Sequence, residues 1–314
     1  MTHVCVLAGG LCPERDVSIR SGRRVADAMR AAGLEVSIRD TDADLLPIWA
    51  ADPPDVVVPL LHGAVGEDGS LRDALDTLHL PYVGAEPRAC RLAFDKPIAK
   101  ALVAAAGVPT PDWIALPHSS FRELGAPRIM AAAVDRLGLP LVVKPTRGGS
   151  ALGLHIVHSL DEMPPAMVGA FAYSDTVMLE AFVPGIELAV SVIDTGDGPQ
   201  ALPAVEIHSD SGIYDYQARY TAGMTEFFCP ATIPHAQATA AAEVALTAHR
   251  TLGIRDLSRT DMIVDPTGVP HFLETNVAPG MTETSLLPQS VAAAGLSLTD
   301  VMSMLVARAA ARGV

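Results

Sequence analysis

The chain has 314 residues, of which 49% are apolar and 18% are charged, and its formal net charge at pH 7 is −14. This length and composition favour a compact globular enzyme or binding protein of two or three domains and exclude a disordered chain. The acidic balance argues against general nucleic-acid binding, because affinity for a phosphate backbone comes mostly from a basic surface. An anionic ligand must therefore be met by a local group of Lys and Arg.

The N-terminal sequence does not resemble a secretory signal, because its short apolar run is followed by Glu14, Arg15 and Asp16. No apolar stretch approaches the roughly 20 residues that a membrane-spanning helix needs. The four cysteines are scattered without C-x-x-C spacing, which predicts neither a zinc site nor a disulfide framework. We expect a cytoplasmic protein that binds neither nucleic acid nor membranes.

The first region, 1–94, alternates strands and helices. Apolar runs predict strands at 3–10, 35–39, 55–61 and 81–84. Helical periodicity predicts helices at 17–32 and 70–78. Such alternation is typical of a parallel sheet covered on both faces. Gly9 and Gly10 lack the rest of the G-x-G-x-x-G fingerprint, so they do not establish nucleotide binding there, and a plain turn is the alternative.

In the rest of the chain we predict two further domains, 95–184 and 185–314. In the second domain we expect a glycine-rich loop, a helix at 96–106 and strands at 140–144, 154–158 and 176–183. In the third we expect a strand at 187–193, an irregular segment at 209–229, and helices at 236–252 and 298–311. The predicted fold class is therefore α/β.

A short acidic hairpin near the end of the chain is the most informative feature of the sequence. Two apolar runs flank the residues DPTG, which predicts two strands joined by a tight turn. A turn centred on the Thr-Gly pair places Asp261 opposite Glu274. The same register places Arg259 opposite Asn276, with all four side chains on one face. Opposed carboxylates need neutralising, and their hard oxygen atoms suit Mg²⁺ held together with phosphates; a solvated polar face is the alternative.

Lys144 and the loop PTRGGSALG that follows it form a second signal. A lysine at a strand end places a positive charge within reach of phosphates, and glycines let backbone N–H groups approach an anion closely. The loop is not a P-loop, because it lacks G-x-x-x-x-G-K-[ST] and leads into a strand rather than a helix. A structural hairpin loop is the alternative to phosphate binding.

Short motifs follow one another along almost the whole chain. They are GGLCPERDVSIRSG at 9–22, LHGAVGEDG at 61–69, FDK at 94–96, VVKPTRGGS at 142–150, YDYQARY at 214–220, FCPA at 228–231, RTD at 259–261, ETNVAPGMT at 274–282 and PGMTETSLLP at 279–288. Each motif is weak alone, but in this order the chain resembles the ATP-grasp superfamily and, more narrowly, the D-alanine:D-alanine ligase family. The resemblance implies an ATP-grasp fold of three domains, in which an N-terminal Rossmann-like parallel sheet is joined by two α+β domains that sandwich ATP.

The resemblance also implies the nucleotide and metal ligands. Lys96 and Lys144 would hold the phosphates of ATP. The other ATP-binding residues would be Glu180, Ala181, Phe182, Val183, Glu187 and Arg219. Two Mg²⁺ ions, with Mn²⁺ as an alternative ion, would be held by Asp261, Glu274 and Asn276. Ala181 and Arg219 both stand where lysine is usual in the family.

Five catalytic residues follow from the same resemblance. Arg259 and the backbone N–H of Gly280 would stabilise the oxyanion of a tetrahedral intermediate. Ser150 and Tyr220 would link to Glu14 by hydrogen bonds and close a lid over the site. A closed lid is needed because an acyl phosphate is hydrolysed by water as well as by amines.

The resemblance further implies the substrate contacts. Glu14 would pair with the ammonium of the first D-alanine, in a pocket that Ser18 and His62 help to form. Ser285 and Leu286 would position the second D-alanine. Read without the resemblance, Glu14 is also suited to a helix N-terminus, and His62 could equally be a satisfied core histidine.

The resemblance therefore predicts ATP-dependent ligation of two D-alanines for peptidoglycan synthesis, through an acyl phosphate, by a homodimer. One alternative is a related ATP-grasp ligase that joins other amino or hydroxy acids in a resistance or natural-product pathway. The other is a non-catalytic ATP-binding regulator. A chain that has lost its activity normally loses charged catalytic groups, whereas the acidic hairpin keeps all of its charges.

Overall fold

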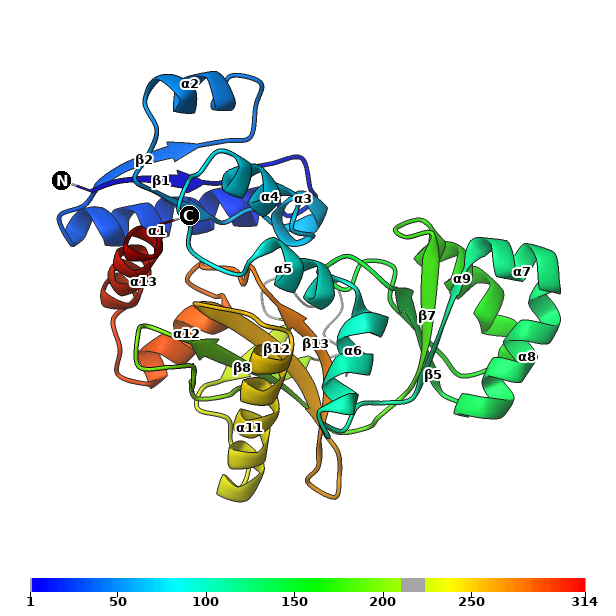
Figure 1. Cartoon of the computed structure of the whole chain (residues 1–314). Coiled ribbons are helices and arrows are strands. Elements are labelled where there is room, and N and C mark those ends of the chain that lie inside the picture. Colours follow the sequence, from blue (N-terminus) through cyan, green and yellow to red (C-terminus); the bar gives the residue numbers. More distant parts are fainter. Residues whose placement is uncertain (1, 210–223, 314) are drawn as a thin grey trace.

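A computed structural model describes residues 2–209 and 224–313, and it contains three sheets that are each covered by helices (Figure 1). The first sheet is three-stranded, in the order β2-β1-β3, and all of its pairs are parallel. Its strands are β1 (His3–Leu7), β2 (Glu35–Arg39) and β3 (Val56–Pro59). The predicted parallel sheet is confirmed.

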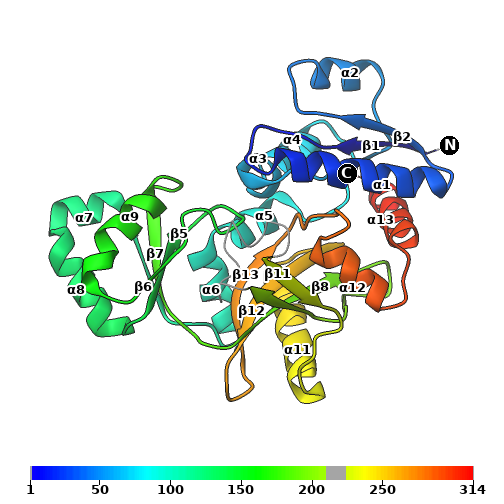
Figure 2. The ribbon, with the colours of Figure 1, turned by 180° about the vertical axis from the view of Figure 1, so that it is seen from behind.

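The continuous apolar run of β1 is explained by burial on both of its faces. Val4 and Val6 pack on one side, in a core formed mainly with α1 (Arg15–Ala31) and α13 (Leu298–Arg312). Cys5 and Leu7 pack on the other side, in a core with α2 (Leu45–Ala51) and α4 (Ser70–Thr77). The first and last helices of the chain therefore lie side by side against the first sheet (Figures 1 and 2).

The second sheet is four-stranded and antiparallel, in the order β4-β7-β5-β6. Its strands are β4 (Trp113–Pro117), β5 (Leu141–Pro145), β6 (His155–Val157) and β7 (Thr176–Ala181). One face is packed by α7 (His118–Leu124), α8 (Ala126–Leu137) and α9 (Met163–Phe171), with the short helix η1 (Leu160–Glu162) before α9. The opposite face is left for the functional site.

The third sheet has six strands, in the order β11-β10-β8-β12-β13, with β9 also paired to β8. Its strands are β8 (Ile186–Ile193), β9 (Gln200–Ala201), β10 (Val205–Ser209), β11 (Thr225–Phe228), β12 (Leu257–Val264) and β13 (Pro270–Asn276). Its apolar face packs on α5 (Pro87–Phe94), α6 (Lys96–Ala105) and α11 (His235–Thr251). The remaining helices among residues 2–209 and 224–313 are α3 (Gly63–Glu67) and α12 (Leu286–Ala293).

The β12–β13 hairpin has the predicted register, with Asp261 paired to Glu274 and Arg259 paired to Asn276. The pairing of the two strands contains an irregularity that the sequence did not reveal. Near the turn the register is shifted by one residue, so that Met262 pairs with Phe272. A bulge lies between this pair and the pair of Asp261 with Glu274. Strict alternation from the core residue Phe272 would turn Glu274 toward the core. The additional residue in the bulge turns it toward the cavity instead.

Two expectations differ from the structure. The strand expected at 81–84 is reduced to one bridge between Val57 and Tyr82, because only the backbone of Pro81 to Val83 meets β3. Part of the segment expected to be irregular forms β11, which pairs with β10 from Glu206↔Phe228 to Ser209↔Thr225. Within the described residues no single helix is long and apolar enough to cross a membrane; α12 and α13 reach that length only as a pair bent by 106°.

Candidate active site

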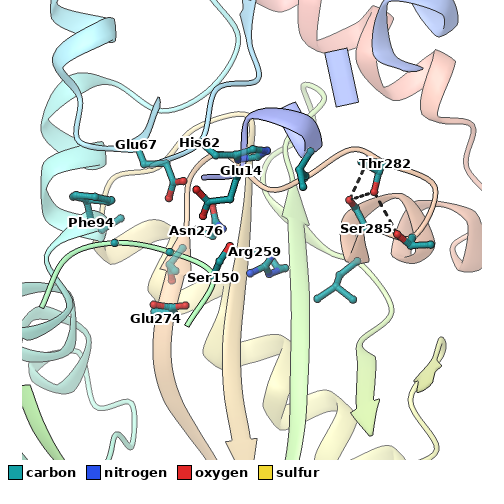
Figure 3. Close-up of a pocket in the computed structure, with 18 of the residues that line it drawn as sticks. Glu14, His62, Glu67, Phe94, Ser150, Arg259, Glu274, Asn276, Thr282 and Ser285 are labelled. Carbon is teal, nitrogen blue, oxygen red and sulfur yellow. Dashed lines mark hydrogen bonds between the residues drawn. The ribbon is translucent and has the colours of Figure 1, made fainter. Parts of the chain in front are cut away.

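Two adjoining cavities lie at the acidic hairpin. The first, of about 530 Å³, is bordered by the first sheet's loops, the hairpin and the segment before α12 (Figure 3). The second, of about 350 Å³, lies between the second and third sheets. Lys96, Gly148, Gly149 and Glu274 line both cavities. The hairpin and the glycine-rich loop are therefore shared by two binding spaces.

On the hairpin, each opposed carboxylate has a cation beside it. Asp261 accepts two hydrogen bonds from Arg259, each of 2.7 Å, in a two-pronged ion pair. Glu274 lies 3.1 Å from Lys96, which is the first residue of α6. Arg259 and Asp261 are both buried, so their charges are poorly screened by solvent. The neutralisation that the register requires is thus present in the protein itself.

The glycine-rich loop is held over the hairpin by the start of α6. Lys96 donates from its Nζ to the carbonyl of Gly148 at 2.8 Å, and Arg147 pairs with Asp95 at 3.0 Å. Ser150 has a positive φ of 54°, a left-handed conformation that is costly for a residue with a side chain. This strained turn lies at the first cavity, which Ser150, Arg259 and Glu274 all line (Figure 3).

The second cavity has an apolar slot with a charged end. Val142, Ile156, Ile207, Ile263 and Leu273 form its apolar walls from both sheets. At the charged end, Lys144 reaches Glu180 at 2.5 Å. The predicted residues Ala181, Phe182, Val183 and Glu187 line the same space. Apolar walls and a lysine together suit a ligand that has an apolar group and an anionic tail.

Glu180 has a second partner that the sequence analysis missed. Lys100, fully buried on α6, contacts the other carboxylate oxygen of Glu180. Burial would raise the pKa of Glu180, but Lys144 and Lys100 outweigh it and hold the pKa below its ordinary value. Burial lowers the pKa of Lys100 to about 8, against the opposing charge of Glu180. The three side chains form a buried ionic cluster.

Glu14, His62 and Glu67 line the first cavity, and they come from the segments that follow β1 and β3 (Figure 3). Glu14 occupies the N-cap of α1, but its side chain makes no capping hydrogen bond. Burial lowers the pKa of His62, which therefore stays neutral near pH 7, and its Nε2 is buried without a hydrogen-bond partner among the described residues. Glu67 accepts from the N–H of Gly63 at 2.9 Å, and burial raises the pKa of its carboxyl to about 7.

The third wall of this cavity is the segment from Gly280 to Leu286. A Cβ on Gly280 would lie 2.8 Å from the Oγ of Ser285, so a larger residue there would require the Ser285 hydroxyl to move. Ser285 accepts from the backbone N–H of Thr282 at 3.0 Å and starts α12. Arg24 on α1 donates to the carbonyl of Thr282 at 2.7 Å, which fixes this wall against the first sheet.

The structure brings most of the predicted site residues together. Glu14, His62, Ser150, Arg259, Gly280, Ser285, Leu286, Glu274 and Asn276 line the first cavity, and Asp261 lines the second. Ser18 lies behind the wall, where its hydroxyl accepts from Gly9 and donates to the carbonyl of Leu60. Arg219 and Tyr220 lie outside the described residues. Glu67 was missed although it belongs to the LHGAVGEDG motif, and Lys100 was missed although it lies one helical turn after Lys96.

The fold is that of the ATP-grasp class of α/β proteins. The family model described as D-ala D-ala ligase C-terminus matches residues 102–307. A D-alanine–D-alanine ligase from Nitrosomonas europaea is 41% identical over 300 residues, covering 95% of this chain and 94% of that protein. The chain therefore belongs to the D-alanine–D-alanine ligase family.

Solved structures show the same likeness. The VanG D-Ala:D-Ser ligase from Enterococcus faecalis superimposes with a TM-score of 0.85 at 26% identity, covering 98% of this chain and 99% of that one. The D-alanine–D-alanine ligase from Bacillus anthracis in complex with ATP gives a TM-score of 0.82 at 28% identity, covering 99% and 98%. The likeness extends over all three sheets.

Proposed function

We propose that the protein joins two D-alanine molecules into D-alanyl-D-alanine for peptidoglycan synthesis, using ATP and an acyl phosphate intermediate. The observation that carries the proposal is the hairpin shared by the two cavities, with Arg259, Asp261, Glu274 and Asn276 on one face. A carboxylate in the first cavity and a phosphate tail from the second would meet there. Family membership supplies the identity of the substrates.

ATP is proposed to occupy the second cavity, and the ligase from Bacillus anthracis, which has the same fold, binds ATP in its own structure. The apolar slot suits an adenine ring, and Lys144 at its charged end suits the phosphates. Lys96 stands where the two cavities join, so it would contact the phosphate group nearest the amino acid. Glu180, Ala181, Phe182, Val183 and Glu187 keep their predicted adenosine roles in this proposal.

The hairpin is proposed to hold Mg²⁺. Its carboxylate and amide oxygens are hard donors of the kind that Mg²⁺ prefers; Glu274 lines both cavities, Asn276 the first and Asp261 the second. In the structure Arg259 neutralises Asp261, and Lys96 neutralises Glu274. These two carboxylates carry the negative charge that would bind the ion. When bound, the ion would neutralise phosphate charge during transfer to the carboxylate.

The first cavity is proposed to bind both amino acids. Glu14 is buried and offers an acceptor for the ammonium of the first D-alanine. His62, being neutral, adds a polar ring there without repelling the ammonium. Arg259 and Gly280 line the same cavity, and the guanidinium and the N–H would stabilise the negative charge that develops on the oxygen of the tetrahedral carbon. Ser285 and Leu286 would then position the second D-alanine.

Other features remain proposals from the resemblance. Ser150, Arg219 and Tyr220 would cover the site and exclude water from the acyl phosphate. We also propose that the domains divide at 94 and 184, that the protein is a homodimer and that it is cytoplasmic. Helix α6 lies in the proposed second domain but packs on the third sheet, so it would link the two.

The experiment that tests the proposal measures phosphate release from ATP and Mg²⁺ with single and paired D- and L-amino acids. Release with D-alanine alone, and D-alanyl-D-alanine identified by mass, is the expected result. Glu123→Gln, at an exposed site on α7, is the matched control for substitutions of cavity carboxylates. Absence of D-alanine-dependent phosphate release would overturn the proposal.

The likeness to a D-Ala:D-Ser ligase favours a second candidate, in which the second substrate is another D-amino or D-hydroxy acid. This candidate changes the acceptor alone and keeps ATP and the first D-alanine. The panel therefore includes D-serine and D-lactate, each paired with D-alanine. Mixed product in excess of D-alanyl-D-alanine at equal concentrations would favour this candidate over the first.

A further inference from the structure

Lys100 is a charged side chain with no solvent exposure in a chain that uses lysine sparingly. The sequence contains three lysines, Lys96, Lys100 and Lys144, among its 22 Lys and Arg residues. All three lie around the second cavity or directly behind it. Lysine differs from arginine in being a compact charge that can lose its proton when buried. Lysine at these positions therefore provides compact charges, and a buried one can lose its proton.

The contacts of Lys100 are specific. It shares Glu180 with Lys144, so that each lysine holds one carboxylate oxygen. Its ammonium also lies 5.1 Å from the ring centre of Trp113, over the ring face. Lys100 does not line the cavity, whereas Lys144 and Glu180 do. Lys100 can therefore act on a ligand only through these two neighbours.

The surrounding charges determine what the cluster presents to a ligand. Glu180 from β7 and Lys144 from β5 are the nearest charges, and Asp112 before β4 adds a more distant negative charge. Lys96, one turn earlier on α6, is balanced by Glu274 from β13. With Lys100 protonated, the cluster of two lysines and one glutamate carries one net positive charge. With Lys100 neutral, it carries none.

We propose that Lys100 is a positioning residue for ATP, which takes up part of the charge of Glu180 and so leaves Lys144 free to attract the triphosphate. This inference rests on the proposed function, since it assumes that ATP occupies the second cavity. Without Lys100, Glu180 would pair with Lys144 alone and compete with the phosphates for its ammonium. The ammonium of Lys144 would then be more fully neutralised and would be directed toward Glu180, so it would attract an anion less strongly.

The proposal implies a pH dependence with a definite sign. Because the pKa of Lys100 is about 8, roughly nine-tenths of Lys100 is charged at pH 7 and roughly one-tenth at pH 9. Anionic ATP prefers the charged cluster, so bound ATP raises the pKa of Lys100 and ATP affinity falls as pH rises through 8. One elementary charge acting through the protein at this range corresponds to a change in affinity of roughly fivefold.

The test measures ATP binding by calorimetry with Mg²⁺ and without D-alanine, at pH 7 and pH 9. We expect the dissociation constant of the unaltered protein to rise roughly threefold between the two pH values, because about one-tenth of Lys100 is still charged at pH 9. Lys100→Met should show the weaker affinity at both pH values, because its cluster is neutral throughout. Lys100→Arg should restore the tighter affinity and keep it at pH 9, because arginine stays charged. Comparison at equal pH cancels the ionisation of ATP and of other groups.

A second measurement does not depend on any variant folding. Protein labelled with ¹³C at lysine Cε has three lysine signals, whose titration between pH 6 and pH 11 can be followed with and without ATP. One signal should titrate near pH 8 in the free protein and move to higher pH with ATP. If ATP binds but no lysine midpoint moves, or if Lys100→Met keeps the pH dependence of the unaltered protein, the inference is overturned and the proposed function is unaffected. If ATP does not bind to the unaltered protein, the proposed function fails, and the inference fails with it.

Discussion

Glu67→Gln is the substitution whose effect on stability can be worked out most directly from the structure. The carboxyl of Glu67 is buried in the first cavity, and burial raises its pKa from 4.5 to about 7. A carboxyl with a raised pKa binds its proton more tightly in the folded chain than in the unfolded chain. Its contribution to stability is therefore fully present below about pH 4.5 and is lost as the pH rises to about 7.

The size of the loss follows from the pKa values. A rise from 4.5 to about 7 corresponds to roughly 3 kcal/mol of stability lost above pH 7. Glutamine keeps an oxygen that can accept from the N–H of Gly63 and removes the ionisation. We therefore expect Glu67→Gln to gain roughly 2 to 3 kcal/mol over the unaltered protein between pH 5 and pH 8.

The assay is the thermal midpoint of the ligand-free protein at both pH values, where this gain corresponds to about 5 °C. Glu123→Gln, on the exposed face of α7, is the control and should change stability by less than about 0.5 kcal/mol at either pH. The reasoning is refuted if the midpoints of Glu67→Gln and of the unaltered protein change in parallel from pH 5 to pH 8. That outcome would mean that the carboxyl is solvated and does not lie buried beside Gly63.

Three further predictions concern the reaction. Glu274→Gln removes an anionic oxygen and the partner of Lys96, so ligation and Mg²⁺ affinity should fall together by at least about tenfold, and an unchanged Mg²⁺ titration of phosphate release would contradict this. Lys144→Ala should raise the Michaelis constant for ATP by roughly 10- to 100-fold, because it removes a charged hydrogen bond. If steady-state kinetics show an unchanged dependence on ATP, the glycine-rich loop is not part of the ATP site. D-alanine should be preferred over D-lactate as second substrate, increasingly so from pH 6 to pH 9 as more amine is deprotonated, and mass analysis showing mainly depsipeptide at both pH values would overturn this preference.

Much of the fold could be predicted because it follows from local patterns. The run from His3 to Leu7 is apolar at nearly every position since successive residues enter two different cores, which is the signature of a covered parallel strand. The helices α1, α4, α6, α11 and α13 begin and end within two residues of their expected bounds. Their periodicity, and in α1 the following Gly33 with a φ of 84°, carried that information in the sequence.

The elements that were missed were not all missed for the same reason. Strand β10 contains Glu206 and His208, whose side chains pair with each other at 2.5 Å, so its sequence lacks a continuous apolar run. It becomes a strand because β8 and β11 flank it. Helix α8 begins with Pro127 in its first turn, a recognisable helix start that the sequence analysis did not use. Tertiary pairing decided the first case, and an overlooked local signal explains the second.

The active-site region divides in the same way. The hairpin could be predicted because its residues are close in sequence, and their pairing needs only a turn and an alternation of side chains. The cluster of Lys100 and Glu180 joins residues from α6 and β7 that are 80 positions apart. Their contact depends on how α6, which packs on the third sheet, is placed relative to β7 of the second sheet. No local sequence pattern predicts that placement. The same long-range contact links the two sheets that enclose the second cavity, so a substitution at Lys100 should alter ATP affinity even though its side chain does not reach the cavity.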